Sequence, residues 1–129
     1  TGDASDFGDL INCQGGQPVG SVSNLTNDRV CFSNGNRQTS SPCSGAKNQI
    51  SYITITSTGD STDFGDLTSN VGGSLGTSDG TDERGVWAGN GGADQNVIEY
   101  ITINSTGNAT DFGDLSRGRQ NAPGVSNVG

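Results

Sequence analysis

The chain has 129 residues and a formal net charge of −8, with six Lys and Arg residues and no histidine. This acidic balance argues against nucleic acid and anionic membranes as partners, and it removes the commonest general base and metal ligand. Apolar residues make up 28 %, but the 22 glycines bring the composition close to that of ordinary globular proteins, so we expect one ordered, glycine-rich domain.

A ten-residue signature opens the chain and returns twice, each time ending in Asp-Phe-Gly-Asp-Leu. Asp63 follows Asp6 by 57 residues, and Asp111 follows Asp63 by 48 residues. Self-similarity at such a period is typical of repeat architectures, in which each unit buries its apolar face against a neighbour. The sequence contains no unrepeated constellation of catalytic groups, so we expect no enzymatic activity. The expected units within this single module are about 1–56, 57–104 and 105–129.

The first unit contains a divergent insertion at 33–48, rich in Asn, Ser and Pro. Cys31 lies just before this insertion and Cys43, twelve residues later, lies within it, so a disulfide between them would pin this segment in an oxidising compartment. Two free thiols are the alternative. Cys13 is then unpaired, and we expect it to be a small buried hydrophobic residue.

Two similar segments, 49–55 and 96–103, predict the longest strands. Both are rich in β-branched and aromatic residues with partial alternation, and Ser-Thr-Gly, a turn pattern, follows each of them closely. In the second segment both faces carry apolar side chains, which indicates an internal strand that is covered on each side.

Shorter strands are expected at 29–35 and 84–90, each with one aromatic residue, and at the glycine-led stretches 20–23, 76–79 and 124–127. One unit would then contain about four strands. No window shows helical periodicity, so the fold class is all-β, a repeat architecture of short antiparallel strands.

The signature supplies the large apolar side chains of each unit. Phe64 and Phe112 occupy equivalent positions, a leucine follows three residues later, and the glycine between them lets the backbone bend so that both side chains face inward. We therefore expect Phe64 and Phe112 to be equally buried.

The second full repeat carries a family resemblance. It reads Arg-Gly-Val-Trp-Ala-Gly-Asn, and then Asn-Val-Ile-Glu-Tyr-Ile-Thr-Ile-Asn-Ser-Thr-Gly-Asn-Ala-Thr-Asp-Phe-Gly-Asp-Leu. This order resembles a kelch-type β-propeller blade, and more closely the repeats of virion structural and tail-fibre-like proteins of tailed phages, especially cyanophages. The resemblance covers nearly all of 57–129 and weakens over 11–48. It implies a blade-like fold and a structural role in a virion.

The number of units bears on the assembly. A closed propeller needs at least about four blades, whereas this sequence contains two complete units and a half-unit. We expect oligomerisation to complete the structure by covering strand edges. A three-fold β-trefoil-like arrangement and a β-sandwich are the alternatives.

Three kinds of ligand or modification site are candidates. Carboxylates near a turn could bind Ca²⁺, although they could equally cap backbone N–H groups, and no other cofactor is expected. Aromatic residues could stack on sugars or belong to the core. The candidates are Asp79, Asp82 and Glu83 for calcium, Trp87, Tyr52 and Tyr100 for sugar, and Asn24, Asn104 and Asn108 for N-glycosylation.

The function expected from these features is that of a non-enzymatic, extracellular structural subunit of a virion fibre, tail or decoration, or of a surface filament. It would self-assemble through β-strand edges with other copies of itself or with other virion or filament subunits. The alternative is a lectin-like carbohydrate-binding module that recognises surface glycans.

Overall fold

The computed structural model describes residues 2–11, 20–23, 28–33, 48–70, 73–80, 83–89, 96–119 and 123–126. These residues form eight strands in two four-stranded antiparallel sheets, which confirms the all-β prediction. The first sheet contains β1 (Ser21–Ser23), β2 (Arg29–Ser33), β3 (Gln49–Thr54) and β4 (Thr62–Asp66). The second contains β5 (Leu75–Ser78), β6 (Arg84–Ala88), β7 (Val97–Thr102) and β8 (Thr110–Asp114).

The two sheets have the same topology and the same irregularity. In each sheet, neighbouring strands are consecutive in sequence. Tyr52 pairs with Thr62 and Tyr100 with Thr110, and the register shifts between Ile50 and Ser51 in β3 and at the equivalent place in β7. The sequence repeat is thus also a repeat of strand pairing.

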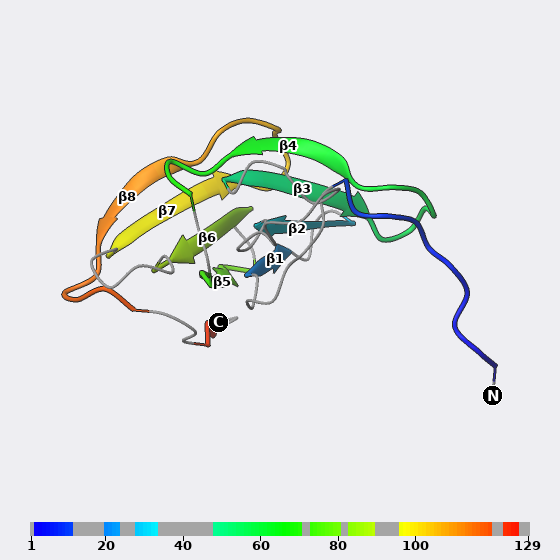
Figure 1. Ribbon diagram of the computed structural model, residues 1–129, viewed down its shortest axis with the longest axis horizontal. Helices are drawn as coiled ribbons and strands as arrows, with labels where there is room; N and C mark the ends of the chain where they lie inside the picture. Colours follow the sequence, from blue (N-terminus) through cyan, green and yellow to red (C-terminus); the bar gives the residue numbers. More distant parts are fainter. Residues whose placement is uncertain are drawn as a thin grey trace, which may run out of the picture.

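The sheets meet along their first strands. β1 lies beside β5, while β4 and β8 lie at the outer side of the molecule (Figure 1). Gly20 is required there, because a Cβ at this position would collide with the backbone of Gly76 and with the Trp87 ring. The indole N–H of Trp87 donates to the Gly20 carbonyl over 3.1 Å. The absence of side chains at Gly20 and Gly76 therefore allows the Trp87 ring to pack closely against the backbone.

The core joins both sheets and includes part of the signature. Phe64 and Leu67 are buried, as expected from the bend that Gly65 allows between them. Other members of the cluster are Val22, Cys31, Ile50, Trp87, Ile101 and Ile103.

The expected equivalence of the signature phenylalanines is wrong. Phe112 is 58 % exposed, against 3 % for Phe64. Each ring lies edge-on to a tyrosine of its own sheet, so the difference arises elsewhere. The backbone of β4 is covered by residues 107–109 of the following unit, and Ala109 packs against the core that contains Phe64. No described residue covers β8 in this way.

Most of the shorter predicted strands are also found. The glycine-led stretches at 20–23 and 76–79 correspond to β1 and β5, whereas residues 124–126, the described part of the expected stretch 124–127, form no strand. Within the described residues there is no helix of the length and apolarity needed to cross a membrane.

Candidate functional site

The most regular polar contact of the molecule links one unit to the next. The Gly107 N–H donates to the Phe64 carbonyl and the Ala109 N–H to the Asp66 carbonyl, both over 2.8 Å. In return, the Asp66 N–H donates to Asn108 Oδ1 over 3.0 Å. We call residues 64–66 a signature edge, residues 107–109 a turn segment, and their contact a junction.

The same junction occurs once more, at the preceding pair of units. The Gly59 N–H donates to the Phe7 carbonyl and the Ser61 N–H to the Asp9 carbonyl, both over 2.8 Å. The Asp9 N–H donates to Asp60 Oδ1 over 2.9 Å. Asp and Asn are interchangeable at the middle of the turn segment because each offers the Oδ1 acceptor.

A glycine makes the close approach at each junction feasible. Gly8 and Gly65 have φ of 146° and 145°, and a Cβ at either would collide with the carbonyl of the facing turn segment, at Gly59 and Gly107 respectively. The aspartate that precedes the signature phenylalanine stabilises this local bend, since Asp63 Oδ1 accepts the Gly65 N–H over 3.2 Å.

A third signature edge, residues 112–114 on β8, has the same local geometry and is open. Gly113 has φ of 142°, and Asp111 Oδ1 accepts its N–H over 2.9 Å. In contrast to Gly8 and Gly65, Gly113 has no described residue within 4 Å of the position where a Cβ would point. The Phe112 carbonyl, the Asp114 carbonyl and the Asp114 N–H, which are equivalent to the bonded groups of the other edges, have no partner among the described residues.

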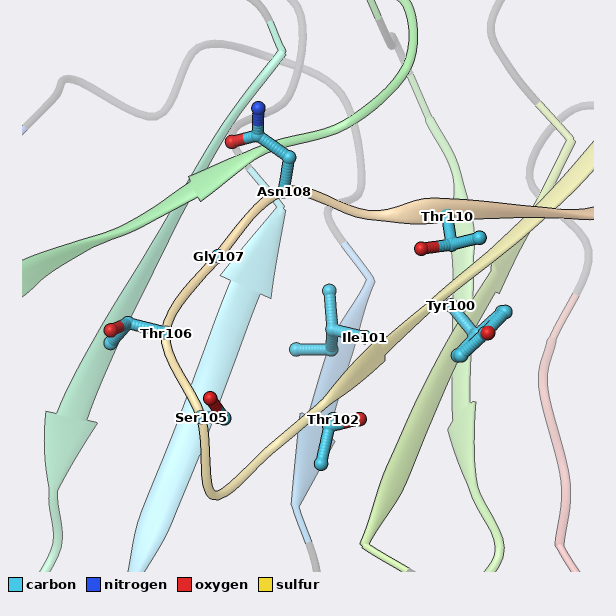
Figure 2. A pocket seen from close by; sticks show the side chains of 8 residues that line it. All are labelled: Tyr100, Ile101, Thr102, Ser105, Thr106, Gly107, Asn108 and Thr110. Carbon is cyan, nitrogen blue, oxygen red and sulfur yellow. The ribbon is translucent and has the colours of Figure 1, made fainter.

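Two equivalent surface cavities accompany the repeats. One of about 390 Å³ includes Tyr52 and one of about 240 Å³ includes Tyr100. Each is enclosed by the end of a strand and the loop that leads into the next strand. The second is lined by Tyr100, Ile101, Thr102, Ser105, Thr106, Gly107, Asn108 and Thr110 (Figure 2).

The chemistry of these tyrosine cavities is polar with one aromatic ring. The Arg29 and Arg84 guanidinium groups lie 4.6 and 4.7 Å from the Tyr52 and Tyr100 ring centroids, so one face of each ring holds a cation. Hydroxyl groups of Ser and Thr supply further donors and acceptors. Asn108 points away from the second cavity, towards β4, in keeping with its place in the junction (Figure 2).

The three aromatic sugar-site candidates do not form one surface. Trp87 is 1 % exposed, so its assignment to a sugar-binding surface is wrong. Its indole N–H is used by Gly20, and its ring fills the space between the sheets. Tyr52 and Tyr100 are half-buried and line separate cavities.

The calcium candidates are only partly described. Asp82 lies outside the described residues. Asp79 and Glu83 are half-buried; the Asp79 N–H donates to the Arg84 carbonyl over 3.3 Å, and the Glu83 carbonyl accepts from Ile103 over 2.7 Å. The described residues hold no group of three or more metal-ligating side chains. Calcium binding at this turn stays a prediction.

Cys31 is fully buried in the core and has no disulfide partner among the described residues, while Cys43 and Cys13 lie outside them. Burial raises the pKa of the Cys31 thiol from 9.0 to about 12, against a smaller lowering by the Arg29 charge. The predicted disulfide with Cys43 remains untested.

Of the glycosylation candidates, Asn104 and Asn108 are exposed and Asn24 lies outside the described residues. Asn108 has a structural role, because its side-chain Oδ1 accepts a hydrogen bond from the Asp66 N–H at the junction. Modification at either exposed position stays a prediction.

Two kinds of residue have structural roles that the sequence pattern does not reveal. The turn segments do lie in connections between antiparallel strands, as the Ser-Thr-Gly turn pattern predicts, but their recurring Gly-Asx-Ser/Ala pattern does not reveal the contact with a signature edge. Glu99 is 3 % exposed, and its Oε2 accepts the Thr68 N–H over 2.7 Å, which satisfies a buried carboxylate.

Comparisons of the chain with models of protein families, with characterised proteins and with solved structures found no match.

Proposed function

We propose that the chain is a non-enzymatic structural module of an extracellular assembly: a virion fibre, tail or decoration, or a surface filament. The observation that carries this proposal is the junction. Its three hydrogen bonds occur twice within the chain, and a third signature edge with the same geometry has no partner among the described residues. A contact that repeats along the chain and leaves one edge without a partner among the described residues is suited to the addition of further units.

Each sheet is further proposed to be a kelch-like propeller blade. Three features support this: four antiparallel strands in sequence order, contact between the sheets through their first strands, and an outermost strand formed by the signature. Two blades fall short of the roughly four that a closed propeller needs, so further units or copies would complete the assembly.

Light scattering on the purified chain tests the structural role. We expect species heavier than the 13.1 kDa monomer, with a mass that rises with protein concentration. A folded chain that remains monomeric even at millimolar concentration would contradict a self-assembling role.

A second candidate function, carbohydrate recognition, is favoured by the two tyrosine cavities, since an aromatic ring beside hydroxyl groups is a common sugar-binding arrangement. A glycan array should then show saturable binding. Tyr100→Leu should weaken it, while Val125→Ala, an exposed change away from both cavities, should not. A flat array would exclude this candidate and leave the structural role standing.

A further inference from the structure

We propose that the open signature edge at Phe112–Asp114 is a docking site for the Gly2–Ala4 segment of a second copy of this chain. The contact would reproduce the two internal junctions between molecules. The inference rests on the proposed self-assembling role and names the surfaces that perform it.

The sequence of residues 2–4 supplies the required groups. Gly-Asp-Ala at 2–4 aligns with Gly-Asp-Ser at 59–61 and Gly-Asn-Ala at 107–109, the two turn segments of the internal junctions. Each residue of 2–4 is thus equivalent to a residue of similar chemistry that makes this contact at an internal junction. The Asp3 carboxylate takes the place of Asp60, and Ala4 takes the place of Ala109.

Three hydrogen bonds follow from this correspondence. The Gly2 N–H would donate to the Phe112 carbonyl and the Ala4 N–H to the Asp114 carbonyl, as Gly107 and Ala109 do at the internal edge. The Asp114 N–H would donate to Asp3 Oδ1, as Asp9 does to Asp60. Addition of a main-chain segment to an exposed sheet edge is an established mode of peptide recognition.

Both surfaces are exposed in the isolated chain. Gly2, Asp3 and Ala4 are exposed and make no hydrogen bond to a described residue. No described residue occupies the space beside Gly113, whereas the facing carbonyl occupies it at Gly8 and Gly65. A docked turn segment would fill that space without any change in the backbone of β8.

Burial differs between β4 and β8, although exposure alone does not mark an open edge, because Leu10 follows the occupied edge at residues 7–9 and is 43 % exposed. Phe64 and Leu67, beside an occupied edge, are 3 % and 2 % exposed. At the open edge Phe112 is 58 % exposed, and Leu115 is half-buried. Exposed apolar side chains next to unpaired backbone groups are characteristic of an unoccupied strand edge.

The geometry of the assembly follows from the positions of the two surfaces. The donor segment and the acceptor edge lie on different parts of one chain, so the contact is heterologous and joins copies head to tail. It contains three hydrogen bonds and a small apolar area, so we expect association that is weak for a single contact and depends on concentration.

The test combines sedimentation with nuclear magnetic resonance of the ¹⁵N-labelled full chain, from about 10 µM to about 1 mM. The average mass should rise with concentration, and the Asp114 amide resonance should shift with it. The Asp66 amide, which is bonded inside every molecule, serves as the internal control and should not shift.

Variants of the donor segment decide the mechanism. Asp3→Ala removes the side-chain acceptor and should weaken association about tenfold, while Asp3→Asn keeps Oδ1, as Asn108 does, and should retain it. Ala4→Pro removes the donor to Asp114 and should also weaken association. All three changes lie in an exposed segment, so the fold should persist.

The outcomes separate this inference from the proposed function. Oligomers that are unaffected by Asp3→Ala and Ala4→Pro would overturn the docking site and leave self-assembly intact. A chain that is monomeric at every concentration, with an unchanged Asp114 amide, would overturn both. Loss of association with Asp3→Ala and its retention with Asp3→Asn would establish the contact.

Discussion

At the residue scale, identical side chains differ in burial because of their neighbours. Phe64 and Phe112 belong to the same pentapeptide, and each lies with its ring centroid 6.0 Å from that of a tyrosine. Phe64 also has the turn segment of the next unit beside its strand, and Phe112 has none among the described residues. The burial of Phe64 thus involves residues that are about 40 positions away in sequence, and Ala109 of the turn segment is one of them.

This difference predicts unequal costs of truncation. Phe64→Ala should lower the free energy of unfolding by about 3–5 kcal/mol, because it empties a packed core position. Phe112→Ala should cost less than about 1 kcal/mol, because most of its ring is already in water. Urea denaturation of both variants measures the difference, and equal losses would show that β8 is covered in solution.

Cys31 predicts a pH dependence of stability. Burial raises the pKa of its thiol to about 12 in the folded chain, while an unfolded thiol ionises near 9.0. Above pH 9 the unfolded state therefore loses its proton first, and stability should fall as the pH rises from about 9 to about 12. Cys31→Ala should lack this component of the pH profile, and an unchanged profile would contradict the assignment.

The same thiol gives a chemical test of the predicted disulfide. A free Cys31 should resist alkylation at neutral pH in the folded chain and react once denaturant exposes it. If Cys31 is bridged to Cys43, it should instead stay unreactive in denaturant until a reductant is added. Peptide mapping after each step distinguishes the two states.

At the scale of elements, the strands could be predicted and their junctions could not. The β-branched pattern of 49–55 and 96–103 indicated β3 and β7 because side-chain alternation is written in the sequence. Two of the three hydrogen bonds of each junction join backbone N–H and C=O groups, which nearly every residue carries. Its one sequence trace is the repeated Gly-Asx pair, which is equally typical of a simple turn.

The signature glycines test the junction directly, since Gly65 and Gly113 have almost the same φ. Alanine at either position meets the same backbone strain, but only at Gly65 would its Cβ strike the Gly107 carbonyl. Gly65→Ala should therefore cost about 1–3 kcal/mol more than Gly113→Ala. Thermal unfolding of both variants checks this, and equal costs would mean that the junction opens readily.

At the scale of the whole molecule, the two sheets are joined at both of their borders. On the inner border β1 contacts β5, where Trp87 bonds to Gly20. On the outer border the junction ties β4 to the loop before β8. A repeat architecture draws its stability from such nearest-neighbour contacts, so we expect the sheets to unfold together.

Asn108 is the side chain through which the outer border can be loosened alone. Asn108→Ala removes the acceptor for the Asp66 N–H and should cost about 1 kcal/mol, whereas Asn108→Asp should retain the contact because Asp60 performs it at the other junction. Hydrogen exchange should speed up at the amides of residues 66, 107 and 109 in Asn108→Ala, with little change at Gly59, whose junction is intact. Uniformly faster exchange at both junctions would instead show that the units open together. The outer border would then not be an independently stable contact, and a neighbouring unit that docked there would stabilise the whole chain.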